Sequence, residues 1–263
     1  MPPSADCSQN RLLMSALVDE VASNGASVCV LPEEAMLLAS EVKGNSHDVV
    51  EQEWPKFLAH LSKLALHHKI AIIAGGYSPG DGTRLRNTIV AFDQSGVLVG
   101  EYHKLHLYDA FNYQESNYVV AGDELPPIVE LSGFQVGIIN CYDIRFPELT
   151  RDLVDRGANV LAVPAAWVKG PRKEAHWETL LAARAIENTM WVVAAGSTSD
   201  ECIGNSMVID PMGIQKARLT EERIATAICE ITHERIDFVR ERLPVLQNRR
   251  FTTPSLLKTQ VTK

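Results

Sequence analysis

Three residues that could form a nucleophilic site each follow a predicted strand. They are Glu33, Lys104 and Cys141. The thiolate is the reactive form of cysteine, so its thiol needs a base to take the proton or a cation to hold the charge. A carboxylate in a dry pocket can be that base and can later protonate an amine leaving group. A nearby ammonium can stabilise the oxyanion of a tetrahedral intermediate, so the chemistry requires no histidine.

The residues around Cys141 predict a sharp turn from a strand into a helix. The apolar run 135–139 is typical of a short buried strand, and helical spacing follows over 148–156. Pro147 stands where the first helical turn tolerates a missing N–H. Such a turn lifts a nucleophile out of the sheet and points backbone N–H groups at the atom it attacks. Taken alone, however, a cysteine beside an apolar strand can be simply a small core residue.

Glu33 and Lys104 also have ordinary structural interpretations. Glu33 and Glu34 could be two solvated acids near the positive end of a helix. We favour Glu33 because it stands at the mouth of the strand 28–31, where open α/β sheets place their chemistry. Lys104 could be an exposed surface charge, as most lysines are.

The sequence offers little support for a metal site. His103 and His106 form a His-x-x-His pair, but no third ligand is suggested and the chain contains no Cys-x-x-Cys pair. We therefore predict no metal and no cofactor.

The composition is that of an ordinary globular protein. The chain has 263 residues, 46% of them hydrophobic and 22% charged, and no linker or repeat divides it, so one domain over 1–263 is expected. The formal charge of −8 argues against a nucleic-acid partner, and no apolar run of about 18 residues suggests a membrane partner. Five irregularly spaced cysteines suit reduced thiols in the cytoplasm.

The apolar patterns predict helices and strands that alternate along the chain. The expected helices are 10–24, 54–68, 148–156, 177–189 and 234–242. The expected strands are 28–31, 70–74, 87–92, 97–99, 135–139, 159–164, 191–195, 206–210 and 225–231. A hairpin turn at 93–96 mixes antiparallel strands with the α/β units, and 243–250 is expected to be an extended tail.

Three blocks of the sequence resemble the signature blocks of the nitrilase (carbon–nitrogen hydrolase) superfamily. They are 31–33, 103–109 and 140–149, and their order and spacing match as well. The resemblance covers nearly the whole chain. It implies an α/β fold, the four-layer αββα sandwich of this superfamily.

The resemblance also implies roles for five residues. Glu33, Lys104 and Cys141 would form a Glu-Lys-Cys triad, in which Glu33 is the general base and then the acid, and Lys104 holds the oxyanion. Glu115 would position the substrate and the lysine, and Tyr142 would supply an oxyanion N–H. Together they would hydrolyse a linear, non-peptide amide through a thioester on Cys141.

Within the superfamily, several segments look like the deaminated glutathione amidase branch, namely 104–116, 164–171, 176–177 and 243–250. The related ω-amidases, which act on α-ketoglutaramate, share the triad and much of the pocket, so this alternative stays open. Arg145, Trp167 and His176 are candidates for substrate binding, the alternatives being a structural salt bridge and a core aromatic. A homodimer or larger homo-oligomer is also expected.

Two further alternatives come from other classes of protein. An isochorismatase-like hydrolase would use Asp-Lys-Cys, against which Glu33 and the predicted hairpins argue. The chain could also be a homologue that now serves as a binding or scaffold subunit.

The first residues depart from the family pattern. Members usually begin with an apolar strand before the first helix, and residues 1–9 contain no such run. The first strand is therefore expected to be missing, so that a sheet edge is unfilled or the chain start lies downstream of the true one. Because an unpaired edge leaves backbone donors and acceptors open, an upstream apolar strand of about five to seven residues should raise stability.

Overall fold

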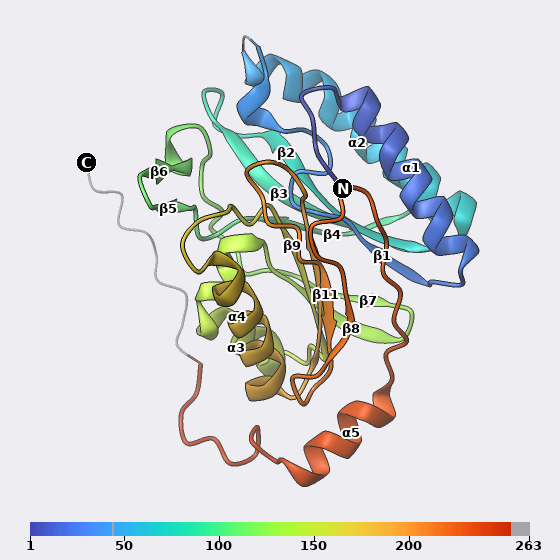
Figure 1. Ribbon diagram of the computed structural model, residues 1–263, viewed down its shortest axis with the longest axis vertical. Coiled ribbons are helices and arrows are strands. Elements are labelled where there is room, and N and C mark those ends of the chain that lie inside the picture. Colours follow the sequence, from blue (N-terminus) through green and yellow to red (C-terminus); the bar gives the residue numbers. More distant parts are fainter. Residues whose placement is uncertain (44, 254–263) are drawn as a thin grey trace.

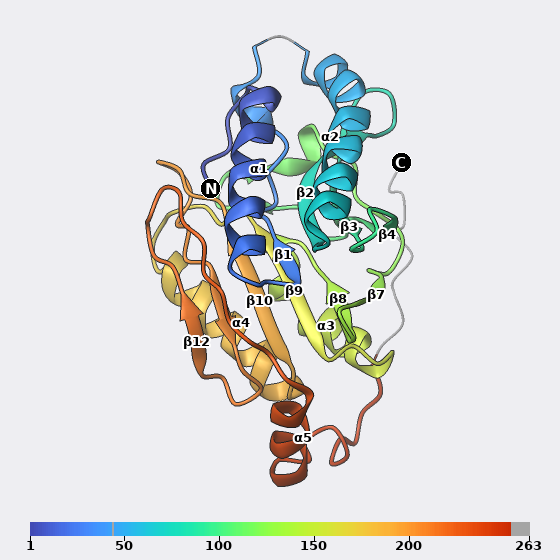
Figure 2. The same ribbon diagram turned by 90° about the vertical axis from the view of Figure 1, so that its right-hand side faces the viewer.

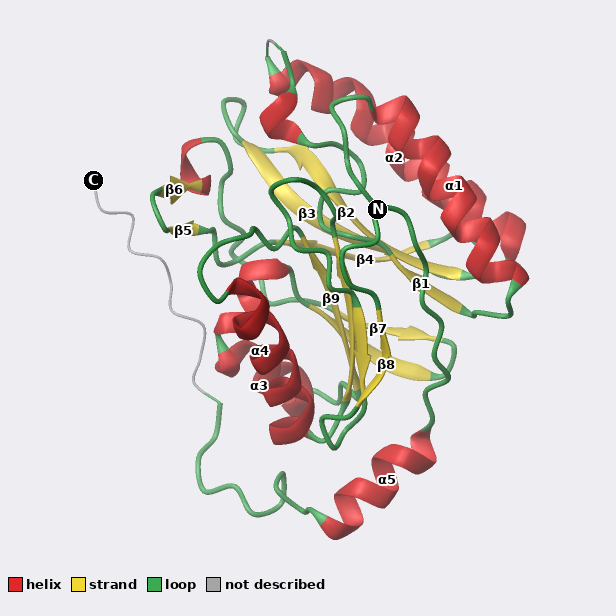
Figure 3. Cartoon of the chain, viewed as in Figure 1, coloured by secondary structure: helices red, strands yellow, loops and turns green. Residues whose placement is uncertain are grey.

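Two β-sheets face each other in the structure, a computed structural model that describes residues 1–43 and 45–253 (Figures 1 and 3). The smaller sheet has the order β1-β2-β3-β4, with β1 (Val28–Val30), β2 (Ala71–Pro79), β3 (Leu85–Phe92) and β4 (Leu98–His103). The larger sheet has the order β12-β11-β10-β9-β8-β7. Its strands are β7 (Ile128–Leu131), β8 (Phe134–Ile138), β9 (Val160–Ala165), β10 (Trp191–Gly196), β11 (Met207–Ile209) and β12 (Gln215–Arg218). A small ribbon pairs β5 (Asp109–Ala110) with β6 (Tyr113–Gln114).

Helices cover the outer face of each sheet (Figure 2). The smaller sheet is covered by α1 (Cys7–Ser23) and α2 (Ser46–His68), and the larger by α3 (Pro147–Asp155) and α4 (Lys173–Asn188). A last helix, α5 (His233–Arg242), lies at one end of the molecule. Short 3₁₀ turns are η1 (Ala39–Glu41), η2 (Glu115–Asn117) and η3 (Cys141–Arg145). The expected four-layer αββα sandwich is thus confirmed.

Side chains on a strand point alternately to its two faces, and this alternation produces three apolar layers. One lies between the two sheets, and one lies between each sheet and its helices. In β2, Ile72 packs under α1 and α2, whereas its neighbour Ile73 packs between the two sheets. Successive strand residues point to opposite faces, so a strand buried on both sides must be apolar throughout. The third layer lies between the larger sheet and its helices, where Trp177 and Leu181 are fully buried. No helix in the described ranges is long and apolar enough to cross a bilayer.

Most expected elements are present, with shifted ends. Helix α1 begins at Cys7 because the Asp6 side chain accepts the N–H groups of Ser8 (2.8 Å) and Gln9 (3.2 Å). The strands β7 and β12 were not predicted. Strand β2 was expected to end before the glycine pair Gly75-Gly76, but it continues to Pro79.

The strand predicted at 225–231 is wrong. These residues belong to no strand, and none of them makes a backbone–backbone hydrogen bond in the described chain. They run beside β1 without pairing to it (Figures 1 and 2). Sequence pattern signals the tendency to form a strand, but a strand exists only where a partner supplies hydrogen bonds.

Gly75 shows why β2 carries glycines at its centre. The N–H of Gly75 donates to the Pro32 carbonyl at 3.0 Å, and a Cβ on this residue would lie 2.1 Å from the backbone oxygen of Glu33. The loop after β1 can therefore close on β2 only where no side chain stands between them.

We predict that Gly75→Ala displaces Glu33 and lowers activity by about 100-fold, the cost of a shift of roughly 1 Å at a reacting group. The matched control is Gly82→Ala, at an exposed turn where a Cβ meets nothing within 4 Å. Steady-state kinetics and thermal melts of both variants test this. Full activity of Gly75→Ala would contradict the assigned role of the glycine.

Candidate active site

The residues expected to do chemistry meet at one end of the sandwich. Glu33 follows β1, Lys104 follows β4, and Cys141 follows β8. Together with Glu115, at the start of η2, they line one cavity of about 110 Å³. The structure therefore brings together the three residues predicted to follow strands and Glu115, which the family resemblance implied.

Lys104 lies between two carboxylates. Its Nζ donates to Oε1 of Glu33 at 2.9 Å and to Oε2 of Glu115 at 2.9 Å. All three side chains are at most 4% exposed. Charges this deeply buried are tolerated only where partners satisfy them, and here the remaining carboxylate sites are also occupied.

Backbone groups fill those remaining sites. Oε2 of Glu33 accepts the N–H of Ala166 at 2.7 Å, and Oε2 of Glu115 accepts the N–H of Tyr108 at 2.6 Å. Ala166 follows β9 of the larger sheet, so Glu33 is bound from both sheets. This arrangement fixes the Glu33 carboxylate in one position.

Asn87 on β3 is a part of the site that sequence analysis missed. Its Nδ2 donates at 2.8 Å to Oε1 of both Glu33 and Glu115, and its Oδ1 accepts from Nδ2 of Asn140 at 2.8 Å. Asn87 thus joins the carboxylates to the residue before Cys141. The only signal in the sequence is a polar side chain at the start of an apolar run.

Cys141 stands at a strained turn. Its φ of +47° lies in the left-handed region, which a non-glycine residue adopts only when its surroundings enforce it. The Asn140 N–H donates to the Asp143 carboxylate at 3.0 Å, and the Asp143 N–H donates to the Asn140 carbonyl at 3.0 Å, so these two residues close the turn. The buried Asp143 carboxylate also accepts from Tyr102 Oη at 2.7 Å and bonds the His106 ring nitrogen Nδ1 at 2.8 Å. The loop that carries Lys104 and the turn that carries Cys141 are therefore fastened together.

The two histidines beside Lys104 have different partners. His106 bonds Asp143 and stacks on Phe146 at 3.6 Å between ring centroids, whereas His103 bonds Thr88 at 3.0 Å. They do not share a common site as the His-x-x-His pattern allowed.

Burial and charge set the protonation states of the triad. Burial raises the pKa of Glu33, but the Lys104 ammonium and hydrogen bonds from Lys104, the Cys141 thiol and the Ala166 N–H outweigh it, so the pKa is lowered. Burial and then the Glu33 charge raise the pKa of Cys141 well above its usual value. Burial alone would lower the pKa of Lys104, and the two carboxylates raise it instead. The resting site thus holds a neutral thiol, a carboxylate and an ammonium.

Glu34 is not the solvated acid that was considered for it. It lines the same cavity as Glu33, and Tyr77 Oη donates to its Oε1 at 3.0 Å. Burial, followed by the nearby Glu33 charge, raises the pKa of Glu34 to about 8. At neutral pH this side chain is therefore an uncharged acid.

Two cations stand by the cavity without a carboxylate partner among the described residues. Lys173, at the start of α4, is buried and donates from Nζ to Tyr108 Oη at 2.7 Å. The Arg145 guanidinium lies 4.7 Å from the Trp167 ring, and its Nε and Nη2 are buried without a hydrogen-bond partner in the described chain. Arg145 was predicted from the sequence, whereas Lys173 was not, because only the fold brings the start of α4 to the cavity.

The remaining candidates divide into two groups. Tyr142 and Trp167 line the cavity, and Trp167 donates from Nε1 to the Lys173 carbonyl at 2.9 Å. His176 lies one turn along α4 and is not among the lining residues. The Tyr142 N–H belongs to the first turn of η3, where intrahelical acceptors are lacking.

Comparison with known sequences gives consistent results. The carbon–nitrogen hydrolase family matches residues 1–241. The deaminated glutathione amidase of Escherichia coli O157:H7 is 43% identical over 254 residues, covering 95% of this chain and 94% of its own length. The mouse deaminated glutathione amidase is 33% identical over 269 residues, covering 92% of this chain and 79% of its own.

Solved structures show the same fold. The Caenorhabditis elegans NitFhit protein superimposes with a TM-score of 0.88 and 33% identity, over 95% of this chain and 63% of that one. An amidase from Nesterenkonia sp. AN1, solved with acrylamide, gives a TM-score of 0.81 at 22% identity over 95% of this chain and 91% of its own. The chain therefore belongs to the carbon–nitrogen hydrolase family.

Proposed function

We propose that this protein hydrolyses a small acidic amide to an acid and an amine or ammonia, through a thioester on Cys141. The observation that carries the proposal is the buried Glu33 carboxylate, which binds Lys104 and lies close enough to the Cys141 thiol to be stabilised by it. A base, a cation and a nucleophile in one cavity support amide chemistry.

In the first half-reaction, Glu33 takes the thiol proton as sulfur attacks the amide carbonyl carbon. The carbonyl oxygen becomes an oxyanion, which Lys104 and the Tyr142 N–H stabilise. The Lys104 ammonium has three N–H donors, and its two carboxylate partners leave one for the substrate. The C–N bond then breaks, and the leaving amine takes the proton back from Glu33.

The second half-reaction uses the same groups. Glu33 removes a proton from water, which attacks the thioester carbonyl, and the oxyanion again lies at Lys104. Collapse breaks the C–S bond, releases the acid and returns the proton to the Cys141 sulfur. Glu115 does no proton transfer in this mechanism; it accepts a hydrogen bond from the Lys104 ammonium and holds it in place.

The unpaired cations support an acidic substrate. Lys173 and Arg145 stand by the cavity without carboxylate partners in the described part of the chain, so a carboxylate on the substrate would satisfy both. Deaminated glutathione and α-ketoglutaramate both carry one on the acyl part, at the end away from the amide carbonyl. We favour deaminated glutathione because relatives covering most of this chain bear that name. An ω-amidase acting on α-ketoglutaramate is the second candidate.

The proposal also includes the cellular compartment and the oligomeric state. The substrate is taken to be a metabolite of the cytoplasm, in keeping with five free cysteines. The active form is taken to be a homodimer or larger homo-oligomer built from one catalytic domain per chain.

We predict opposite behaviour for the two neighbouring acids. Glu33→Gln should abolish acylation, because an amide cannot accept the thiol proton. Glu34→Gln should keep near-normal kcat below pH 8, because a neutral amide resembles the neutral acid it replaces. Comparable losses of kcat in the two variants would contradict these roles.

The pH dependence of the protein's stability should also report the protonation state of Glu34. The pKa of Glu34 is about 8 in the folded chain against 4.5 as the usual value, so the folded state binds the extra proton and stability falls as pH rises from about 4.5 to about 8. Glu34→Gln removes this fall in stability with rising pH, because the amide does not titrate. Its Tm advantage over the unaltered protein should be small at pH 5, grow up to pH 8 and then level off. A pH-independent difference would be inconsistent with a buried, protonated Glu34.

We predict that Lys173→Met raises KM for deaminated glutathione and α-ketoglutaramate by roughly 10- to 100-fold, the usual value of a hydrogen bond to a charged group. Turnover of a neutral amide such as butyramide should change little. The control is Lys169→Met, an exposed lysine in the preceding loop. The unaltered enzyme should prefer deaminated glutathione in kcat/KM. A ratio at or below one would favour the ω-amidase, and equal losses on neutral and acidic amides would remove Lys173 from substrate binding.

A further inference from the structure

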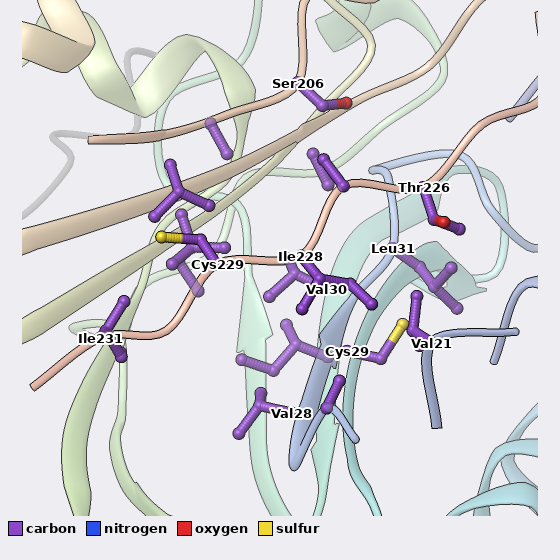
Figure 4. Close-up of a pocket in the computed structure, with 18 of the residues that line it drawn as sticks. Val21, Val28, Cys29, Val30, Leu31, Ser206, Thr226, Ile228, Cys229 and Ile231 are labelled. Carbon is purple, nitrogen blue, oxygen red and sulfur yellow. The ribbon is translucent and has the colours of Figure 1, made fainter. Parts of the chain in front are cut away.

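Two cavities of the molecule differ in what they offer a ligand. The larger, of about 530 Å³, lies beside β1 and is lined mainly by apolar side chains such as Val28, Val30 and Ile228 (Figure 4). No lysine or arginine of the described chain lines it. An acidic amide is therefore expected in the smaller cavity, which contains the triad. Glu34 lines that cavity as well, and the mechanism above does not use it.

Tyr77 determines which oxygen of Glu34 carries the proton. Tyr77 lies on β2 and is 3% exposed, and in the described chain its Oη has one hydrogen-bond partner, Oε1 of Glu34 at 3.0 Å. A buried hydroxyl needs an acceptor, so the Tyr77 O–H donates and Oε1 accepts. The carbonyl oxygen is the better acceptor of a neutral carboxyl group. The single O–H of that group is therefore on Oε2.

The surrounding charges keep Glu34 neutral. Glu33 and Glu115 already share the Lys104 ammonium, and within the described ranges Glu34 forms no ion pair. A third carboxylate charge in this cavity would have no compensating cation beside it. Burial and then the Glu33 charge raise the pKa of Glu34 to about 8, in agreement with this geometry.

The Oε2 hydroxyl of Glu34 is available to a bound molecule. It has no hydrogen-bond partner among the residues that the structure describes, although Glu34 lines the cavity. The reacting carbonyl of the substrate is already assigned to the oxyanion donors, and the substrate carboxylate to Lys173 and Arg145. An anion beside Glu34 would also lie near the Glu33 charge. The acceptor that fits the hydroxyl is therefore a further, uncharged oxygen.

We propose that Glu34 is a specificity-determining residue, which donates a hydrogen bond from Oε2 to a second, uncharged carbonyl oxygen of the substrate. This inference deepens the proposed function and rests on it. Two carbonyl groups could be the acceptor, namely the α-keto group of the acyl part and the peptide carbonyl of the leaving part. Deaminated glutathione carries both, α-ketoglutaramate carries only the keto group, and glutaramate, the monoamide of glutaric acid, carries neither.

The experiment measures kcat/KM on these three amides at pH 7 for the unaltered protein, Glu34→Leu and Glu34→Gln. Leucine lacks the donor, whereas glutamine keeps an N–H that can donate. Glu34→Leu should lose roughly 2- to 10-fold, the usual value of a neutral hydrogen bond. A keto acceptor predicts this loss on deaminated glutathione and α-ketoglutaramate, and a peptide acceptor predicts it on deaminated glutathione alone. Glutaramate should be spared, and Glu34→Gln should restore the lost activity.

A double variant guards against a general loss of stability. Glu34→Leu leaves the Tyr77 hydroxyl buried without an acceptor, which is destabilising. Tyr77→Phe/Glu34→Leu removes both partners of this hydrogen bond, and thermal melts compare its stability with that of the single variant. The double variant should show the same substrate pattern as Glu34→Leu.

A pH profile gives a readout that a structural role would not change. Glu34 loses its O–H as it ionises near pH 8. On the amides that are sensitive to Glu34→Leu, kcat/KM of the unaltered protein relative to Glu34→Gln should therefore fall between pH 7 and pH 9. The fall should be smaller on glutaramate. Ionisation of the substrate affects both proteins equally and cancels in this ratio.

The other ionisable groups that face Glu34 do not explain such a fall. They are Glu33, Glu115, Lys104, Tyr77, Tyr113, Tyr118 and Cys202. Burial raises the pKa of the three tyrosines and of the cysteine. The attraction between Glu33 and Lys104 outweighs burial, which lowers the pKa of the carboxyl group and raises that of the ammonium.

Several results would overturn the inference and leave the proposed function intact. They are equal losses of kcat/KM on all three amides, no loss on any of them, and a ratio to Glu34→Gln that stays constant with pH. If the unaltered protein hydrolyses none of the three amides, the proposed function is wrong and the inference fails with it.

Discussion

The ammonium of Lys104 is the interaction on which the candidate site depends. Two carboxylates, Glu33 and Glu115, are held almost completely out of water with this single cation between them. Removing one partner of a buried ion pair typically costs about 3–5 kcal/mol, because a charge is left without compensation. The hydrogen bonds from Asn87, Ala166 and Tyr108 supply what one cation cannot. Since Ala166 follows β9 of the larger sheet and Lys104 follows β4 of the smaller one, this cluster also ties the two sheets together at their active end.

The same cluster explains why the thiol is neutral at rest. The site already has one more negative than positive charge, so a free thiolate at Cys141 would add an uncompensated charge in a buried place. Proton transfer to Glu33 is therefore expected only as the sulfur bonds to carbon and the negative charge moves to the substrate oxygen. The strained turn at Cys141 and the Asp143 network hold the sulfur ready for that step. The backbone strain at this turn lowers the stability of the fold but fixes the position of the Cys141 sulfur.

Sequence alone predicted the parts of the site that follow strand ends. Glu33, Lys104 and Cys141 were found because the carboxyl ends of strands are readable as places where an apolar run stops. Asn87 and Lys173 were missed because nothing local distinguishes them: their importance comes from contacts between distant segments. Whether Glu34 is a solvated acid was left open, since burial of its side chain depends on how the loop after β1 closes on Gly75.

The helices and strands were likewise predicted only in part from the sequence. Helices and buried strands were predicted from apolar spacing. Their observed ends differ from the predicted ones where a capping side chain such as Asp6 starts the helix. Strand β12 was missed because Gln215–Arg218 is exposed and carries no apolar alternation. The opposite error occurred at 225–231, where a strand-like sequence has no partner to pair with. Among the described residues β1 pairs only with β2, and β1 leads into Glu33, so the order of this strand bears directly on the site.

The proposed mechanism requires a covalent bond between Cys141 and the acyl part of the substrate, and mass spectrometry of the acid-quenched enzyme detects such a bond. During turnover of deaminated glutathione or α-ketoglutaramate, the protein should gain the mass of one acyl group, and peptide mapping should place it on Cys141. Cys202 lines the same cavity and serves as the internal control, because its thiol, whose pKa burial raises to about 12, hydrogen-bonds Ser199 and not the Glu33 carboxylate. The account predicts an adduct on Cys141 alone, and neither adduct nor turnover in Cys141→Ala. An adduct on Cys202, or sustained turnover by Cys141→Ala, would contradict it.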